Sequence, residues 1–225
     1  MVLWFVGIFR MMLVKKINCV QLCRRSSNWA VNVLDFIQGK KATKIRQIGD
    51  PILREIAKPV ERAAFISPDF KHLIDELIHT MRKTNAAGIS APQIGIPLQV
   101  IAFEVTGHDI KLAMKKYGSK GVSKMQMTLC PLTVFVNPKV KFLDTKTVTM
   151  RESCLSVENL SALVPRVREI KVEGLDRSGE FLEMHATGWT ARIIQHEVDH
   201  LNGNLYIDTM TYKSLKNEKW QQYKT

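Results

Sequence analysis

The sequence has few cysteines and no long uninterrupted apolar run, and each scarcity excludes a class of protein. The four cysteines, at positions 19, 23, 130 and 154, have no spacing typical of a disulfide framework, which predicts a reducing compartment. The N-terminal apolar stretch is interrupted by Gly7 and ends at Arg10, so it is too short to cross a bilayer as a helix and no membrane span is expected. Internal repeats and low-complexity tracts are also absent. A chain of 225 residues that is 45% hydrophobic is expected to form one globular domain.

Acidic residues are missing from the first 34 positions, which carry basic residues at positions 10, 15, 16, 24 and 25. A basic, apolar and acid-free start is typical of an organellar transit peptide. A secretory signal would place its positive charge before the apolar run, whereas Arg10 follows that run here. We therefore assign residues 1–40 to a targeting segment and expect the folded domain to cover residues 41–225.

Basic residues outnumber acidic ones by 33 to 21, which gives a formal net charge of +12. Such a balance can indicate a nucleic-acid partner. The positive residues are spread along the chain, however, and no basic stripe is interleaved with aromatics, so no dedicated nucleic-acid site is predicted. A dispersed basic surface of this kind favours a location close to the ribosome.

Local patterns predict two helices. Ser67 and Pro68 supply an N-cap and a first-turn proline, and apolar residues follow at positions 70, 73, 74, 77, 78 and 81. This spacing predicts an amphipathic helix that ends near residue 85. A second helix is predicted over residues 189–201, because an Asn-Gly pair that tolerates a left-handed conformation follows it.

Runs rich in β-forming residues predict strands over 98–105 and 132–143, the second of them broken by an Asn-Pro step. Alternation on both sides of a turn predicts a β-hairpin over 167–186. Two proline-marked turns predict an extended arm over 43–61, and the polar, Lys-rich and Met-rich segment 107–130 is predicted to be a surface insertion. The order of these elements predicts an α+β fold with antiparallel sheets.

The strongest chemical signal is the H-E-x-x-H pattern of residues 196–200, which lies inside the second predicted helix. Residues four apart lie on the same face of a helix, so His196 and His200 can direct their imidazoles at one metal ion. Glu197 lies beside them, where it can take a proton from bound water. Two histidines and a general base are the minimum for metal-assisted hydrolysis, although a surface helix rich in histidine and acids can carry the pattern by chance.

A catalytic zinc-type site needs a third protein ligand and an open position for water. Most H-E-x-x-H proteases take that ligand downstream, but no histidine or cysteine follows His200, and the only acids there are Asp208 and Glu218. The third ligand is therefore expected upstream. Cys154 is the best candidate, because a thiolate is a strong ligand for a borderline-soft divalent ion.

Three separated motifs resemble, in the same order, those of the peptide deformylase family. They are GISAPQIG at 88–95, ESCLS at 152–156 and QHEVDH at 195–200. The likeness runs from about residue 45 to about residue 208, apart from the segment 107–130, and is strongest to the animal mitochondrial branch. It implies antiparallel sheets packed around a central metal-binding helix that carries H-E-x-x-H, and a location in the mitochondrial matrix.

The resemblance also implies a hydrolase that removes the formyl group from the N-terminal N-formylmethionine of newly made polypeptides, which would be its partners. One divalent metal ion would be held by Cys154, His196 and His200, with water as a fourth ligand and Glu197 as the proton shuttle. Fe²⁺ is the usual ion in the family, and the same ligands accept Zn²⁺, Co²⁺ or Ni²⁺.

Further roles follow from the same resemblance. The side-chain amide of Gln93 and the backbone N–H of Leu155 would be the catalytic donors to the oxyanion. Gly88 would offer its backbone to the substrate. Glu152 and Arg166 would shape the methionine pocket and its rim, with a purely structural Arg–Glu pair as the alternative.

Ser153 departs from the family, which usually has glycine before the cysteine. If that glycine needs a positive φ or lets the substrate pass closely, serine would strain the loop by about 1–3 kcal/mol or crowd the peptide. A catalytically weak metal-binding paralogue therefore stays open as an alternative. So does a peptidase of the H-E-x-x-H class, which shares the helix and the base but neither the upstream cysteine nor the glutamine loop.

Overall fold

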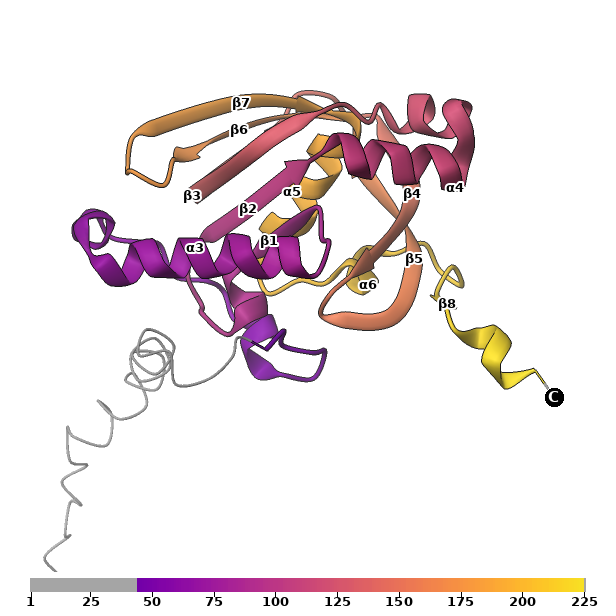
Figure 1. Ribbon diagram of the computed structural model, residues 1–225, viewed down its shortest axis with the longest axis horizontal. Helices are drawn as coiled ribbons and strands as arrows, with labels where there is room; N and C mark the ends of the chain where they lie inside the picture. The colour runs from indigo at the N-terminus through magenta and orange to yellow at the C-terminus, as the bar shows by residue number, and fades with distance from the viewer. Residues whose placement is uncertain (1–43, 225) are drawn as a thin grey trace, which may run out of the picture.

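Two antiparallel sheets and the helix α5 (Gly188–Leu201), which contacts strands of both, organise the computed structural model, which describes residues 44–224 (Figure 1). The first sheet has the strand order β1-β2-β3-β6-β7, and the second has the order β4-β5-β8. Every strand pair in both sheets is antiparallel. The predicted α+β fold with antiparallel sheets is thus confirmed, whereas the predicted targeting segment 1–40 lies outside the described residues.

The first sheet consists of β1 (Gly88–Ser90), β2 (Val100–Val105), β3 (Cys130–Phe142), β6 (Glu169–Leu175) and β7 (Phe181–Thr187). The second consists of β4 (Thr147–Cys154), β5 (Val157–Val167) and β8 (Lys216–Asn217). The other α-helices are α3 (Pro68–Lys83), α4 (Gly107–Met125) and α6 (Tyr206–Thr209). Short 3-10 turns are η1 (Pro51–Arg54), η2 (Arg62–Ile66), η3 (Ala91–Ile94) and η4 (Trp220–Tyr223).

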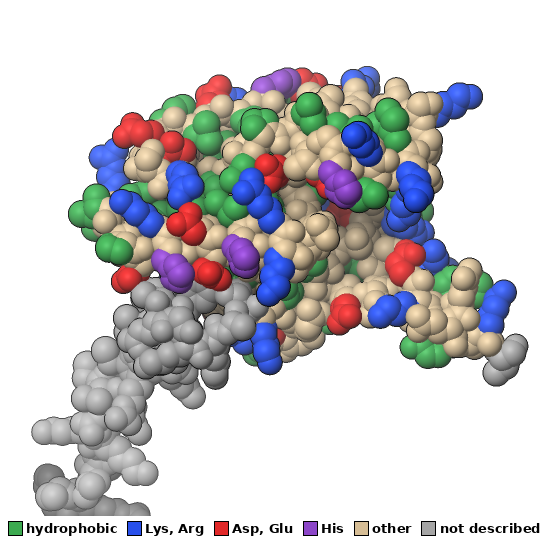
Figure 2. All heavy atoms as spheres, viewed as in Figure 1, with side chains coloured by type: hydrophobic (Ala, Val, Ile, Leu, Met, Phe, Trp, Pro, Cys, Tyr) green, Lys and Arg blue, Asp and Glu red, His purple; other side chains and the backbone are tan. Residues whose placement is uncertain are grey.

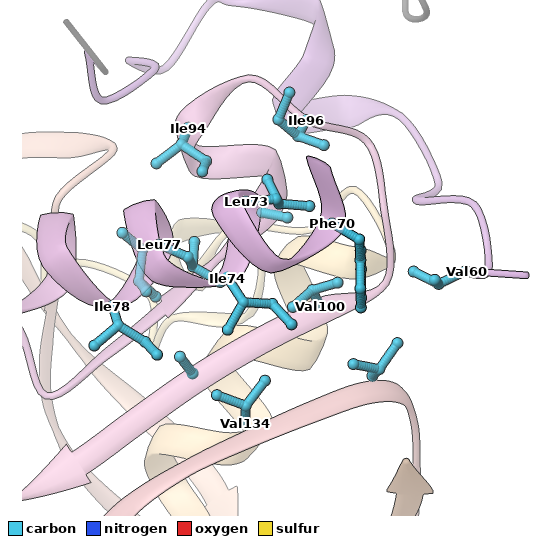
Figure 3. Packing of buried hydrophobic residues seen from close by; sticks show 14 of the residues in the cluster. Val60, Phe70, Leu73, Ile74, Leu77, Ile78, Ile94, Ile96, Val100 and Val134 are labelled. Atoms are coloured by element: carbon cyan, nitrogen blue, oxygen red, sulfur yellow. The ribbon is translucent and has the colours of Figure 1, made fainter. Parts of the chain in front are cut away.

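Helix α3 forms where the sequence predicts the first helix. The hydroxyl of Ser67 accepts a hydrogen bond of 3.2 Å from the backbone N–H of Asp69, which caps the helix start. The apolar stripe faces the first sheet, where Ile74 and Leu77 pack in one cluster with Val100 of β2 (Figure 3). Complete burial of such a side chain stabilises the fold by about 1.5–3 kcal/mol. The stripe therefore fixes α3 on the sheet.

The predicted strands are present as β2 and β3, and the predicted hairpin is formed by β6 and β7. Strand β3 continues through the Asn137-Pro138 step, where its register against β6 shifts. Asn137 takes a positive φ of 53°, and its side chain exchanges hydrogen bonds of 2.8 and 2.9 Å with the backbone of Val60. Cys130, the last residue of the segment predicted as a surface insertion, begins β3 and is buried.

The segment predicted as a surface insertion, 107–130, contains helix α4, which the sequence analysis did not anticipate. A capping box begins the helix, since Asp109 accepts from the backbone N–H of Thr106 at 2.7 Å and donates its own N–H to the Thr106 hydroxyl at 3.2 Å. Gly118, at φ 69°, kinks the helix near its middle. Its buried side chains are Ala113 and Val122.

The described part of the arm predicted over 43–61 is extended apart from the 3-10 turn η1, and the turn η2 follows it. Arg54 of η1 binds the Asp208 carboxylate of α6 at 2.5 and 3.1 Å, which joins the arm to the C-terminal part of the chain. Within residues 44–224, no helix combines the length and apolar character needed to cross a bilayer.

Candidate metal centre and active site

Three side chains that can bind a metal converge where α5 meets the end of β4. His196 and His200 lie one turn apart on α5, with ring centroids separated by 5.1 Å. Cys154 is the last residue of β4, and its Sγ lies 3.2 Å from Nε2 of His200. One ligand atom from each residue lies within 4.8 Å of the other two. The structure thus brings together the three ligands that the sequence analysis predicted.

The hairpin of β4 and β5, which the sequence analysis did not predict, delivers Cys154 to α5. The two strands pair from Thr147 opposite Val167 as far as Ser153 opposite Ser161, and the register then shifts at the cysteine. Exposure alternates along much of β4, so the period-2 pattern of a strand was available in the sequence. The position of the thiol therefore depends on strand pairing that no local motif specifies.

Glu152 lies buried in a charged network behind the candidate ligands. Its Oε2 lies 2.9 Å from Nδ1 of His196, while Arg166 donates to both carboxylate oxygens at 2.9 and 3.0 Å and Arg192 donates to Oε1 at 2.6 Å. Burial opposes ionisation of Glu152, but hydrogen bonds from His196 and Arg166 outweigh it and lower the pKa of the carboxyl to about 2. The carboxylate fixes the ring of His196 and leaves Nε2 of that ring available as a ligand.

Glu152 and Arg166 form a buried ion pair, which is compatible both with a role in the methionine pocket and with a purely structural role. Arg166 is only 7% exposed and also donates to Asp199 at 2.5 Å. Arg192, which no sequence motif indicated, donates to the carbonyl of Val164 at 2.9 Å in addition to its bond with Glu152. Its only signal was its place one turn before the first histidine of α5. Arg192 therefore joins the β4–β5 hairpin to the helix that carries the histidines.

Glu197 is buried beside the candidate ligands and next to Gly88 of β1. Burial raises the pKa of Glu197 to about 7, although the charge of His196 opposes the shift. A carboxyl group that titrates near neutral pH can both accept and return a proton. Its Oε2 has no hydrogen-bond partner among residues 44–224, so this oxygen is not committed to a structural contact.

Gln93 and Leu155 place two potential hydrogen-bond donors beside Cys154. The side-chain carbonyl of Gln93 accepts from the backbone N–H of Ser90 at 2.9 Å, which turns its Nε2 toward the thiol at 3.4 Å and toward Ser156 Oγ at 3.3 Å. Leu155 follows Cys154 directly, in the turn between β4 and β5. Both residues that the sequence analysis chose as donors thus lie at the candidate centre.

Ser153 does not have a left-handed φ. It lies in β4 opposite Ser161, and its side chain is exposed. The described non-glycine residues with a left-handed φ are Asn85, Gln126, Asn137, Asn159 and Lys213. The first of the two possibilities raised for position 153, a positive φ, does not apply, because Ser153 is a strand residue. Ser153 does line the cleft beside the ligands, so crowding of a bound peptide is the part of that prediction that stays open.

A cleft of about 860 Å³ opens beside the candidate ligands and Glu197. Figure 2 shows the surface hollowed between α4 and the C-terminal segment. Apolar side chains that the sequence analysis missed contribute to its lining, among them Met127, Trp189 and Ile193. Ile193 lies one turn before Glu197 on α5, so the two share a helix face. A cleft of this size and composition is suited to a peptide.

Comparison with known proteins gives consistent matches. The family model described as polypeptide deformylase matches residues 42–216. The chain is 42% identical to the Homo sapiens protein named peptide deformylase, mitochondrial, over 78% of this chain and 71% of that one. It is 40% identical to peptide deformylase 1A, chloroplastic, of Solanum lycopersicum, over 77% of this chain and 62% of that one. Among solved structures, the Met-Ala-Ser-bound class I type b peptide deformylase from Acinetobacter baumannii matches with a TM-score of 0.66 and 31% identity, over 76% of this chain and 99% of that one.

Proposed function

The chain belongs to the polypeptide deformylase family, and from that premise we propose that Cys154, His196 and His200 hold its catalytic metal ion. The family consists of metal-dependent hydrolases that remove the formyl group from the N-terminal formylmethionine of newly made polypeptides, and this is the function of the chain. The observation that carries the assignment of the site is the convergence of one thiol and two imidazoles within 4.8 Å, beside the buried Glu197.

The donor set fits a single divalent ion. One thiolate and two imidazoles are three protein ligands, the number found in catalytic zinc-type sites. A fourth coordination position is then left for water. Glu152 holds Nδ1 of His196, and His200 presents Nε2 to the sulfur of Cys154, so the donors face a common point. We infer Fe²⁺ as the native ion because it is the usual ion in the family. The same ligands also accept Zn²⁺, Co²⁺ and Ni²⁺. When bound, the ion supplies a Lewis acid that activates water and polarises the formyl oxygen.

Glu197 is the proposed proton shuttle. Its buried carboxyl group, with a pKa raised to about 7, can take a proton from the attacking water and return it to the departing amine nitrogen. Its place next to His196 on α5 holds it on a rigid element, so its position relative to the ligands does not depend on a loop.

Negative charge develops on the formyl oxygen during the attack, and fixed N–H donors aimed at that oxygen lower the barrier. We assign this role to the side-chain amide of Gln93 and the backbone N–H of Leu155. The bond between Gln93 and Ser90 orients the amide before substrate arrives. Gly88 lies in β1, an edge strand of the first sheet, and offers backbone groups with which an extended substrate can pair.

The methionine side chain of the substrate is proposed to lie against Met127, Trp189 and Ile193, which line the cleft beside Glu197. Glu152 also lines the cleft, and its ion pair with Arg166 would shape this pocket by holding its wall in place. Apolar surface buried on binding contributes about 25 cal/mol per Å², so a thioether chain gains affinity in such a pocket.

The activity is tested with protein purified under anaerobic conditions and assayed on a formyl-methionyl peptide beside its unformylated form. Deformylation of the first, with no cleavage of internal peptide bonds, is expected. Endopeptide cleavage would favour a peptidase of the H-E-x-x-H class, and the absence of both reactions in metal-loaded protein would favour a catalytically weak paralogue.

The mitochondrial matrix is the proposed location, supported by the basic, acid-free start of the chain and by the name of the human relative. A reporter fused to residues 1–40 should enter mitochondria, and a secreted or cytosolic reporter would contradict the proposal. The basic surface further supports approach to the ribosome as the source of formylated chains. That approach predicts cosedimentation with mitochondrial ribosomes at low salt, weakened as salt rises.

A further inference from the structure

Helix α4 presents one face to the catalytic cleft. The α4 residues that form this face, here called the α4 stripe, are Asp109, Leu112, Ala113, Lys116 and Tyr117. They recur at separations of three and four residues, which places them on a single side of the helix. Leu112 is 51% exposed and Tyr117 is 49% exposed, so the stripe offers apolar surface toward the cleft.

The α4 stripe shares its cleft with the catalytic residues. Cys154, His196 and Glu197 line the same cavity, and residues at the C-terminal end of α4 and just after it, Met125 and Met127, line it too. Residues of β4, β5 and the C-terminal segment, among them Arg151, Leu160 and Glu218, complete the lining. A ligand whose reacting end lies at Glu197 can therefore extend from the catalytic centre along α4.

Two sheet edges favour an extended chain as that ligand. Strand β1 is the edge of the first sheet and β4 is the edge of the second, and both contribute residues to the cleft. A peptide that pairs with a sheet edge is extended and advances about 3.3 Å per residue, with side chains that point alternately to either side. The cleft of about 860 Å³ is large for a formylmethionine alone, so residues that follow the methionine have space within it.

We propose that the α4 stripe is a binding subsite for the substrate residues that follow formylmethionine, and that it selects formylated peptides of four or more residues with an apolar side chain near the fourth position. This inference rests on the deformylase function and names the substrate class that the site prefers. The occupant is the substrate's own chain, because it is covalently continuous with the methionine bound beside Glu197. Leu112 and Tyr117 lose exposed apolar surface when that chain lies against them, which favours binding.

The test compares the dipeptide formyl-Met-Ala with two longer peptides, formyl-Met-Ala-Ala-Phe-Ala and formyl-Met-Ala-Ala-Asp-Ala. The metal-loaded wild type should have a higher kcat/KM for the peptide with phenylalanine than for the other two, through a lower KM. In the double variant Leu112→Ala, Tyr117→Ala this advantage should shrink by about 3- to 10-fold, while kcat/KM for the dipeptide stays at the wild-type value. Both side chains are half exposed, so their removal leaves the core intact.

Met114→Ala is the matched control. Met114 lies on α4 and is 50% exposed, as the tested side chains are, but it does not line the cleft. The control should keep the full preference for the long apolar peptide. The inference is overturned if the double variant retains that preference, or if Met114→Ala loses as much of it. A wild type that deformylates none of the three peptides would instead refute the underlying activity, and this result is distinguishable because it also removes the dipeptide rate.

Discussion

Gly88 and Glu197 lie so close together that a side chain at position 88 would displace the proposed proton shuttle. A Cβ atom built on Gly88 would be 2.7 Å from Oε1 of Glu197 and 2.7 Å from Cγ2 of Ile193, shorter than Cβ contacts in real proteins. Gly88 does not take a left-handed φ, so glycine is required here for space and not for backbone freedom. Gly88 of β1 thus packs directly against the face of α5 that carries Ile193 and Glu197.

Gly88→Ala should therefore lower kcat/KM by about 10- to 100-fold, because a displacement of a catalytic group by about 1 Å can have an effect of that size. Metal content should not change, since the atoms nearest to the new methyl group belong to Glu197 and Ile193 and not to the three proposed ligands. Steady-state kinetics with elemental analysis measures both quantities. Gly107→Ala is the control, because a Cβ there meets nothing within 4 Å, and it should behave as the wild type.

Cys154→Ala should release the metal and abolish deformylation, because two imidazoles alone hold a divalent ion poorly. Elemental analysis of the purified protein gives the occupancy. Cys130→Ala is the matched control, since Cys130 is buried at the start of β3 and should leave occupancy unchanged. Full metal occupancy in Cys154→Ala would refute the ligand assignment.

Glu197→Gln should keep the metal and reduce turnover by about 10²- to 10⁴-fold, the contribution typical of general acid–base catalysis. The amide preserves the shape of the side chain but cannot take the proton. The measurement is kcat on a formyl-methionyl peptide with the metal content matched to that of the wild type. Turnover close to normal in metal-replete protein would exclude Glu197 as the shuttle.

Arg192→Ala should lower the free energy of unfolding by about 1–3 kcal/mol, because it removes buried hydrogen bonds while Glu152 keeps Arg166 and His196 as partners. The substitution removes one guanidinium donor from Glu152 and one from the carbonyl of Val164. Metal affinity should fall by about 10- to 100-fold as the support of His196 loosens. Urea denaturation of metal-free protein and a competition titration measure the two effects.

The control for that experiment is Arg82→Ala. Arg82 pairs with Glu104 on the surface and is 55% exposed, so its loss should hardly change the unfolding transition. An equal loss of stability in the two variants would mean that burial of the network around Glu152 has no special weight.

Ser153→Gly should change kcat/KM by less than about threefold, because the serine has an extended strand conformation and no left-handed strain that glycine could relieve. The measurement is kcat/KM of the wild type and of Ser153→Gly on the same short formyl peptide. A rise of tenfold or more would show that the serine side chain crowds the substrate in the cleft.

The arrangement of the candidate residues on α5 could be predicted from the sequence because helical geometry is local. A separation of four residues places His196 and His200 on one face and Glu197 beside them whatever the rest of the chain does. The same holds for α3, whose cap and apolar spacing are contained in one continuous stretch. The choice of Cys154 as the third ligand followed from the absence of histidine and cysteine downstream, and the motif resemblance supplied Gln93 and Leu155.

Only the tertiary structure decided which distant residues meet at the site. Cys154 reaches His200 because β4 pairs with β5 and the hairpin is held against α5, contacts that depend on the packing of both sheets. For the same reason the network around Glu152, with Arg192 as a member, could not be predicted from the sequence. The backbone conformation of Ser153 likewise became known only with the pairing of β4 and β5. The α4 stripe faces the cleft because the packed fold places one side of that helix there, whereas its sequence showed only a polar, Lys-rich and Met-rich segment.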